Sequence, residues 1–360
     1  MQDNSMSRWL APLMAFCLSF LMIATLAPLV GIQTERQIDF WLLWLASMLI
    51  LALPLAYLEI ALVKRAKISA LQALSSLTRD ADASARWRLA GWLAALFIPF
   101  FAGGMLAHSS DLLLSQQNLG VNSTVIIAAA AVLALILSLL ARPILLGLAA
   151  LGVLASLITA NVMGDTASNW QMTAIQSKEL LYAAVLALVA TGLGLGMYGQ
   201  TSLPQVKNRD EASKTVLPIW IAQLIAVLAF AFFSVKLAVP AITLLISAIA
   251  VSAVMLQMAR EQLAHRQLAV PVQWLLVVIP MLLWAVPAIS VVLNPILIIW
   301  GLVIALIYAI FVGWVMKISH LRKALNFSNE LFYNLWRIAV RIILPLTIIL
   351  SLIAFIGSLL

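Results

Sequence analysis

The sequence predicts an all-α polytopic membrane protein in which eleven helices cross the bilayer. Of its 360 residues, 64% are hydrophobic and only 9% are charged, a balance that excludes a soluble globular domain. Apolar stretches of roughly 20 residues, the length that a bilayer core requires, recur along the whole chain. They cover the approximate ranges 9–31, 40–63, 89–109, 124–141, 144–163, 180–203, 216–235, 238–259, 270–293, 296–316 and 338–359. We therefore treat residues 1–360 as a single transmembrane domain.

The distribution of basic residues agrees with this assignment. If the N-terminus lies in the cytoplasm, 18 of the 21 Lys and Arg residues fall on the cytoplasmic side, and the other side holds only Arg36, Lys178 and Lys236. Such an excess of Lys and Arg in cytoplasmic loops is typical of membrane proteins. We expect a bacterial-type inner membrane, with the N-terminus in the cytoplasm and the C-terminus outside.

Composition also limits the function classes. The net charge of +8 is explained by the basic cytoplasmic loops, so we expect no nucleic-acid partner. The single cysteine, Cys17, excludes an intramolecular disulfide and a Cys-rich metal site. No catalytic triad order, HExxH, CxxC or Walker motif is present, which indicates a protein that is not an enzyme. The expected partners are membrane lipid and a small-molecule solute, with no cofactor and no metal site; the oligomeric state is left open.

The predicted sixth span contains an unusual glycine-rich stretch. Four glycines and three polar side chains lie within ten residues: Gly192, Gly194, Gly196, Gly199, Thr191, Tyr198 and Gln200. Each glycine costs about 1 kcal/mol relative to alanine inside a helix, so the run favours local unwinding. Unwound backbone is tolerated at membrane depth where it lines a cavity or is covered by protein, which points to a solute site. Close helix packing through small residues is the alternative, and both interpretations stay open.

Few other polar groups enter the spans. Glu59 lies near the cytoplasmic end of the second span, where it either satisfies donors inside the bundle or acts as a gate. His108 lies near the external end of the third span, with Asp111 one turn later, and is either an interfacial residue or a group that titrates near neutral pH. Gln223 and Gln257 occupy mid-span positions, where interhelical hydrogen bonding is the usual role.

Several stretches together resemble the neurotransmitter:sodium symporter family, whose members have the LeuT fold. They are residues 53–62 (LPLAYLEIAL), residues 191–196 (TGLGLG) and the region from Trp314 through Arg337 to Pro345. The resemblance implies an inverted repeat of five plus five spans, about residues 9–163 and 180–316, followed by a peripheral span at about 338–359. It also implies a solute site between spans 1, 3, 6 and 8.

The chain departs from the family at the residues that bind ions and solute. The first span lacks the family's glycines, asparagine and arginine; Ser19 and Thr25 are its remaining polar candidates, and Pro28 is the candidate for breaking its helix. Leu106 stands where the family has a tyrosine that binds the solute carboxylate. Ser247 and Ser252 lie near the family's second sodium site but out of register. We therefore expect sodium coupling from the resemblance to the family, although few of the family's ion-binding residues are present in this chain.

Two functions follow. The first is a secondary active transporter that works by alternating access, with a small organic solute such as an amino acid or amine. The alternative is a pseudotransporter that keeps the fold and serves as a membrane scaffold or accessory subunit. A polar cavity at residues 192–196 opposite a broken first span favours transport. A continuous first helix and a filled, apolar centre favour the scaffold.

Overall fold

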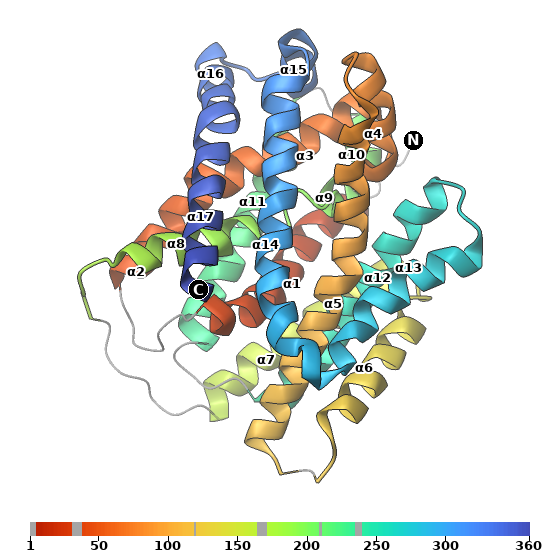
Figure 1. Cartoon of the computed structure of the whole chain (residues 1–360), viewed down its shortest axis with the longest axis vertical. Helices are drawn as coiled ribbons and strands as arrows, with labels where there is room; N and C mark the ends of the chain where they lie inside the picture. The colour runs from red at the N-terminus through yellow and green to blue at the C-terminus, as the bar shows by residue number, and fades with distance from the viewer. Residues whose placement is uncertain (1–4, 31–37, 119, 164–170, 209–210, 235–239) are drawn as a thin grey trace.

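The computed structural model describes residues 5–30, 38–118, 120–163, 171–208, 211–234 and 240–360, and the regular elements in these ranges are helices (Figure 1). The α-helices run in chain order as follows: α1 Ser5–Val30, α2 Ile38–Ser47, α3 Leu53–Ala66, α4 Ala70–Asp80, α5 Leu89–Gln116, α6 Ser123–Leu137, α7 Arg142–Met163, α8 Ser177–Leu188, α9 Met197–Thr201, α10 Leu203–Asn208, α11 Ser213–Ala229, α12 Ala241–His265, α13 Val270–Leu282, α14 Pro287–Ile310, α15 Ile318–Leu325, α16 Glu330–Ile338 and α17 Leu344–Leu359.

Short π-helical turns join several of these helices into longer rods. The turn at Met48–Ala52 connects α2 to α3, and the turn at Ala339–Ile343 connects α16 to α17. Among the described residues, eight helical segments are long and apolar enough to cross a membrane. Two shorter apolar segments, 123–137 and 270–285, and the interrupted pair α8 and α9 occupy the other predicted spans. The all-α membrane architecture is confirmed, and the count of eleven stays a prediction.

Helix α12 lies at the centre of the packing. It contacts α5 and α7 along much of its length and also contacts α6 and α13, while α1 packs mainly against α11. Helix α14 stands between α5 and α17 in Figure 1. The short helix α4 packs its apolar face, which includes Leu71, Leu74 and Leu77, against the bundle. Helices α1, α4, α5, α7 and α12 therefore each have an apolar face covered by a neighbour.

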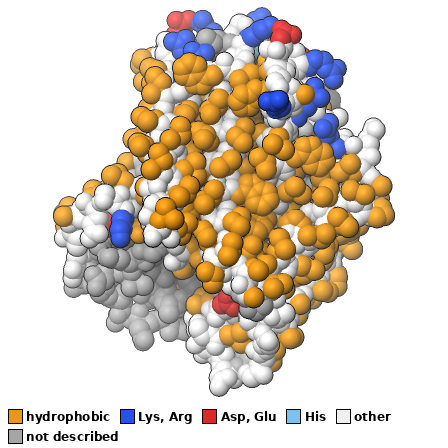
Figure 2. All heavy atoms as spheres, in the orientation of Figure 1, with side chains coloured by type: hydrophobic (Ala, Val, Ile, Leu, Met, Phe, Trp, Pro, Cys, Tyr) orange, Lys and Arg blue, Asp and Glu red, His pale blue; other side chains and the backbone are white. Residues whose placement is uncertain are grey.

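The outer surface has the polarity of a membrane protein. Figure 2 shows an apolar belt over the middle of the molecule and Lys and Arg side chains gathered at the end where α4, α15 and the start of α16 lie. Exposed leucines and isoleucines on α6, α7 and α17 belong to this belt. Since such side chains are stable in lipid, the belt marks the membrane-facing surface. We call the end with α4 and α15 the basic end.

The first span is a single continuous helix, so the prediction that Pro28 breaks it is wrong. Helix α1 runs from Ser5 to Val30 with Pro12 and Pro28 both inside it. Pro28 lies only two residues before the helix ends, where losing one backbone donor has little effect on the turns before it. The structure therefore places one interrupted helix, the sixth span, beside an intact first helix.

Candidate functional site

The sixth span is interrupted at the glycine-rich stretch. Helix α8 ends at Leu188 and α9 begins at Met197. Between them, Gly192, Gly194 and Gly196 have φ angles of +65°, +82° and +77°. Only glycine adopts this left-handed region without steric cost, which explains why these three positions are glycine. Every residue from 183 to 202 is buried, so the interruption, which we call the break, lies inside the bundle.

Glu59 of α3 joins the unwound backbone to α9, the helix that follows it. Its carboxylate oxygens accept hydrogen bonds from the backbone N–H groups of Gly194 and Gly199, each at 2.8 Å. The side chain is buried, being 3% exposed. A buried carboxylate is costly unless donors surround it, and amides freed by unwinding are such donors. The carboxylate and the break therefore stabilise each other, because each supplies the partners that the other lacks.

A second set of bonds converges on the carbonyl oxygen of Thr191. It accepts hydrogen bonds from the Tyr198 hydroxyl at 2.6 Å, from Gln223 Nε2 at 3.1 Å and from the Ser19 hydroxyl at 3.5 Å. These donors come from the far side of the break, from α11 and from α1. Gln262 Nε2 of α12 donates to the Leu195 carbonyl at 3.3 Å. Side chains of neighbouring helices thus satisfy backbone groups that a regular helix would pair internally.

Close packing accompanies the unwinding, so the glycines serve both purposes considered from the sequence. A Cβ at Gly199, which lies inside α9, would stand 2.4 Å from Val63 Cγ2 of α3. A Cβ at Gly196 would stand 2.3 Å from Ala70 Cβ of α4. At Gly192 the nearest atoms belong to Met22 of α1 and Met197, at 3.1 Å and 3.2 Å. Methionine side chains therefore fill the space beside the break.

The other candidate residues lie apart from the break. Thr25 donates to the Leu21 carbonyl of its own helix, and Ser252 donates to the Ala102 carbonyl of α5 at 3.3 Å. Ser247 pairs with Ser156 of α7 at 3.0 Å. Leu106 is a buried apolar residue of α5. Of the proposed pathway residues, Ser19, Thr191, Gly192, Gly194, Gly196 and Tyr198 come together, and Gln200 lies just beyond them on α9.

His108 faces an aromatic neighbour. Its ring makes an edge contact with Trp284, with the centroids 5.5 Å apart. Asp111 follows three residues later on the same helix, about one turn away. Asp111 itself accepts from the Ser123 hydroxyl at 2.6 Å. These contacts tie α5 to the turn Leu283–Ala285 before α14 and to the start of α6, and none of them involves the break.

Three functional candidates escaped the sequence reasoning: Gln262, Glu261 and Arg142. Gln262 binds the break, while Glu261 pairs with Arg142 and accepts from Gln200 Nε2 at 2.7 Å. Glu261 follows Gln257 by four residues on α12, a spacing that puts both on one face of a helix. That spacing was the available signal, but Glu261 lies just beyond the predicted end of the eighth span at residue 259, among the basic residues of the next loop.

Comparison with known proteins is informative only at the level of structure. No protein-family model and no curated protein matches the chain. Among solved structures, MhsT in complex with L-phenylalanine superposes with a TM-score of 0.64 at 14% identity, covering 94% of this chain and 98% of MhsT. A manganese transporter of Eremococcus coleocola superposes with a TM-score of 0.63 at 14% identity, covering 100% of this chain and 90% of the transporter.

The chain has the LeuT fold. The predicted resemblance is thereby confirmed for the fold, over nearly the whole length of both chains. At this level of identity the solute of a neighbour carries no information about the solute of this protein. In this chain α1 is continuous, and the polar groups of the break are bound by side chains from α1, α3, α11 and α12.

Proposed function

We propose that the protein is a secondary active transporter for a small organic solute, such as an amino acid or amine. The observation that carries the proposal is the break in the sixth span, held by a buried carboxylate. Three positive φ angles and a carboxylate inside the membrane are each unfavourable, and such features persist mainly where function requires them. A purely structural span would be more stable as a regular helix. The break is therefore proposed as the hinge of alternating access.

The proposed solute site lies between α1 and the break. In the present conformation Met22 and Met197 occupy this space. Methionine is unbranched and changes rotamer readily, so these two side chains are suited to yield to a solute of modest size. At the break, the hydroxyl groups of Ser19 and Tyr198 and the carbonyl of Thr191 supply polar atoms for such a solute. A solute that binds here would compete with Tyr198 and Gln223 for the Thr191 carbonyl.

Sodium coupling remains a proposal that the residues support weakly. A sodium ion needs several oxygen ligands, and carbonyl and hydroxyl groups are suitable. The Thr191 carbonyl already accepts three donors, and the hydroxyls of Ser247 and Ser252 bond to neighbouring helices. Binding would require these bonds to open. We further propose a bacterial inner membrane with the basic end in the cytoplasm, because Lys and Arg gather there.

Uptake by proteoliposomes tests the proposal. Purified protein is reconstituted and assayed with a panel of amino acids and amines under a sodium gradient, a proton gradient or neither. Accumulation above that of empty liposomes is expected with one gradient. Gly194→Leu protein, which carries a bulky side chain at the break but whose added Cβ meets only Leu55 at 3.9 Å, is the matched negative control. If no gradient drives accumulation of any member of the panel, the transport proposal fails.

The scaffold function is a second candidate because α1 is continuous and methionines fill the centre. A scaffold needs no opening of the centre, so Gly194→Leu, whose added Cβ meets only Leu55 at 3.9 Å, should leave its partner unaffected. Photo-crosslinking in the native membrane, from an introduced side chain at exposed Leu350 of α17, would capture that partner. Uptake by the wild-type protein that Gly194→Leu abolishes would exclude a purely structural role.

A further inference from the structure

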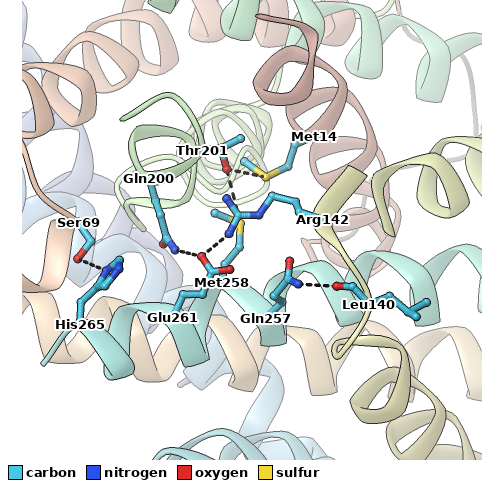
Figure 3. A network of polar contacts seen from close by, with 10 residues as sticks. All are labelled: Met14, Ser69, Leu140, Arg142, Gln200, Thr201, Gln257, Met258, Glu261 and His265. Carbon is cyan, nitrogen blue, oxygen red and sulfur yellow. Dashed lines mark hydrogen bonds and ion pairs between the residues drawn. The ribbon is translucent and has the colours of Figure 1, made fainter. Parts of the chain in front are cut away.

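The end of α12 is fastened to α4 at the basic end. His265, the last residue of α12, has its Nδ1 atom 3.1 Å from the hydroxyl of Ser69, which directly precedes α4 (Figure 3). The next residue, Arg266, donates from Nη1 to the Ser75 hydroxyl of α4 at 2.8 Å. Its guanidinium group also lies over the Trp92 ring of α5, 5.9 Å from the centroid. These contacts hold the Arg266 side chain beside α4.

A polar pocket opens beside this contact. Its volume is about 350 Å³, and its lining includes the side chains of Gln72, Ser75, Ser76, Arg79, Asp80 and Arg266. We call it the α4 pocket. The two serines and Gln72 are half-buried, while Arg79 reaches the surface. A cavity that holds one water needs about 10–15 Å³, so the α4 pocket has room for a much larger polar group.

The charges of the α4 pocket are unbalanced. Arg79 and Arg266 both line it, and neither forms an ion pair with any residue that the structure describes. The carboxylate of Asp80 is paired with Arg65 at 3.2 Å. Two guanidinium groups in one pocket repel each other, and an anion bound between them removes that repulsion. Because a guanidinium group donates to two oxygen atoms at once, the α4 pocket is suited to a phosphate group.

The surface next to the α4 pocket is apolar. Trp92 is in the first turn of α5, and Leu89, the residue that begins this helix, is 59% exposed. Residues three positions apart lie on one face of a helix, so Leu89 and Trp92 form one apolar patch beside Arg266. Since α5 is a membrane span and tryptophan is common at the boundary between lipid and water, this patch lies at the edge of the apolar belt. A ligand that matches both regions carries a phosphate group and hydrocarbon chains.

We propose that the α4 pocket binds the headgroup of an anionic phospholipid. Arg79 and Arg266 contact its phosphate group, and the acyl chains lie along Leu89 and Trp92. Basic pockets beside membrane spans recognise anionic headgroups in this way. The ligand joins α4 to the end of α12, and α4 in turn packs against α9 beside the break. The bound lipid therefore stabilises the folded protein, whether or not the chain transports a solute.

Binding of phosphatidylglycerol to the purified protein tests the proposal. The protein in a neutral detergent is titrated with phosphatidylglycerol, which is anionic, with phosphatidylcholine, which has no net charge, or with inorganic phosphate. Native mass spectrometry counts the bound lipids, and tryptophan fluorescence follows thermal unfolding. Phosphatidylglycerol should bind at least about tenfold more tightly than phosphatidylcholine and should raise the unfolding temperature.

Single substitutions locate the site. Arg79→Gln and Arg266→Gln should each weaken the binding of phosphatidylglycerol about tenfold, because each removes hydrogen bonds between charged groups. Ser75→Ala keeps both charges but loses the hydrogen bond that positions Arg266, so it should weaken the binding about threefold. Arg322→Gln is the matched control, because it removes the same charge from α15, where Arg322 is paired with Glu330. It should leave the binding unchanged.

Three outcomes would overturn the proposal. The first is unchanged binding by both Arg79→Gln and Arg266→Gln. The second is equal weakening by these two variants and by Arg322→Gln, because it would show a general attraction to positive charge. The third is a full rise in unfolding temperature with inorganic phosphate alone, which would assign the α4 pocket to a soluble anion. Each variant is compared with its own lipid-free unfolding temperature, so a general loss of stability does not imitate a loss of binding.

Discussion

Substituting alanine for single glycines separates backbone strain from steric contact at the break. At Gly194 φ is +82°, yet the nearest atom to an added Cβ is Leu55 Cδ1 at 3.9 Å, which is ordinary contact. Gly194→Ala therefore tests backbone conformation alone. An L-residue in the left-handed region costs about 1–2 kcal/mol. That cost lowers the ratio of folded to unfolded protein by about 5–30-fold.

The neighbouring glycine adds a steric term. At Gly196 φ is +77° and the new Cβ would stand 2.3 Å from Ala70 Cβ. Overpacking of this kind costs about 1–3 kcal/mol, so Gly196→Ala should cost about 2–5 kcal/mol in total. Gly147 of α7 is the control, because its added Cβ meets nothing within 4 Å. In an ordinary helix, alanine is favoured over glycine by about 1 kcal/mol, so Gly147→Ala should be neutral or stabilising.

Reversible unfolding in mixed detergent micelles, titrated with SDS, measures these free energies. The expected order of stability is Gly147→Ala, then Gly194→Ala, then Gly196→Ala. Gly194→Ala protein as stable as Gly147→Ala protein would refute the argument, because it would show that the break does not need a left-handed residue at that position. Equal loss at Gly194 and Gly196 would show that contact with Ala70 carries no cost.

Three further outcomes are expected. Tyr198→Phe removes the 2.6 Å hydrogen bond to the Thr191 carbonyl and should cost about 1 kcal/mol in the same titration, because Gln223 still donates to that oxygen. A loss as large as that of Gly196→Ala would show that Gln223 does not replace Tyr198 as a donor. Ser247→Ala removes an interhelical hydrogen bond to Ser156 and should lower the free energy of unfolding by about 0.6 kcal/mol, while the sodium dependence of any uptake stays unchanged. A shift in the sodium concentration for half-maximal uptake would place Ser247 at an ion site. Trp336→Phe removes the 3.1 Å hydrogen bond from Nε1 to the Pro54 carbonyl, which fastens α16 to α3, and should therefore speed proteolytic cleavage of the connector before α16. An unchanged cleavage rate would show that packing alone holds α16.

Much of the architecture was accessible from single segments of the sequence. Apolar length and the placement of Lys and Arg describe how one segment interacts with lipid or water, and they require no knowledge of neighbours. Most helices follow the predicted ranges, as α12 does with 241–265 where 238–259 was expected. The predicted boundary between the ninth and tenth spans is wrong, because α13 ends at Leu282 and α14 begins at Pro287, inside the predicted range 270–293. The glycine run likewise indicated unwinding, because the conformational preference of glycine is a local property.

The sequence does not predict which residues form hydrogen bonds with each other at the site. Glu59 binds Gly194 and Gly199 across separations of 135 and 140 residues. In the sequence, Thr25, Ser247 and Ser252 are equally good polar candidates for the site. In the structure, each forms a hydrogen bond with its own helix or with a neighbouring helix away from the break. A hydroxyl in a span must find some partner, and the sequence does not state which helix presents it.

The sequence by itself thus determined that the chain crosses a membrane as helices, where its charged end lies and where its sixth span is weak. Only the tertiary structure decided that α1 stays intact, that methionines rather than open space adjoin the break, and that Arg142 and Glu261 meet at the basic end. The physical reason is that hydropathy and backbone preference act within one segment. Hydrogen-bond partners and filled volume depend on which segments pack side by side.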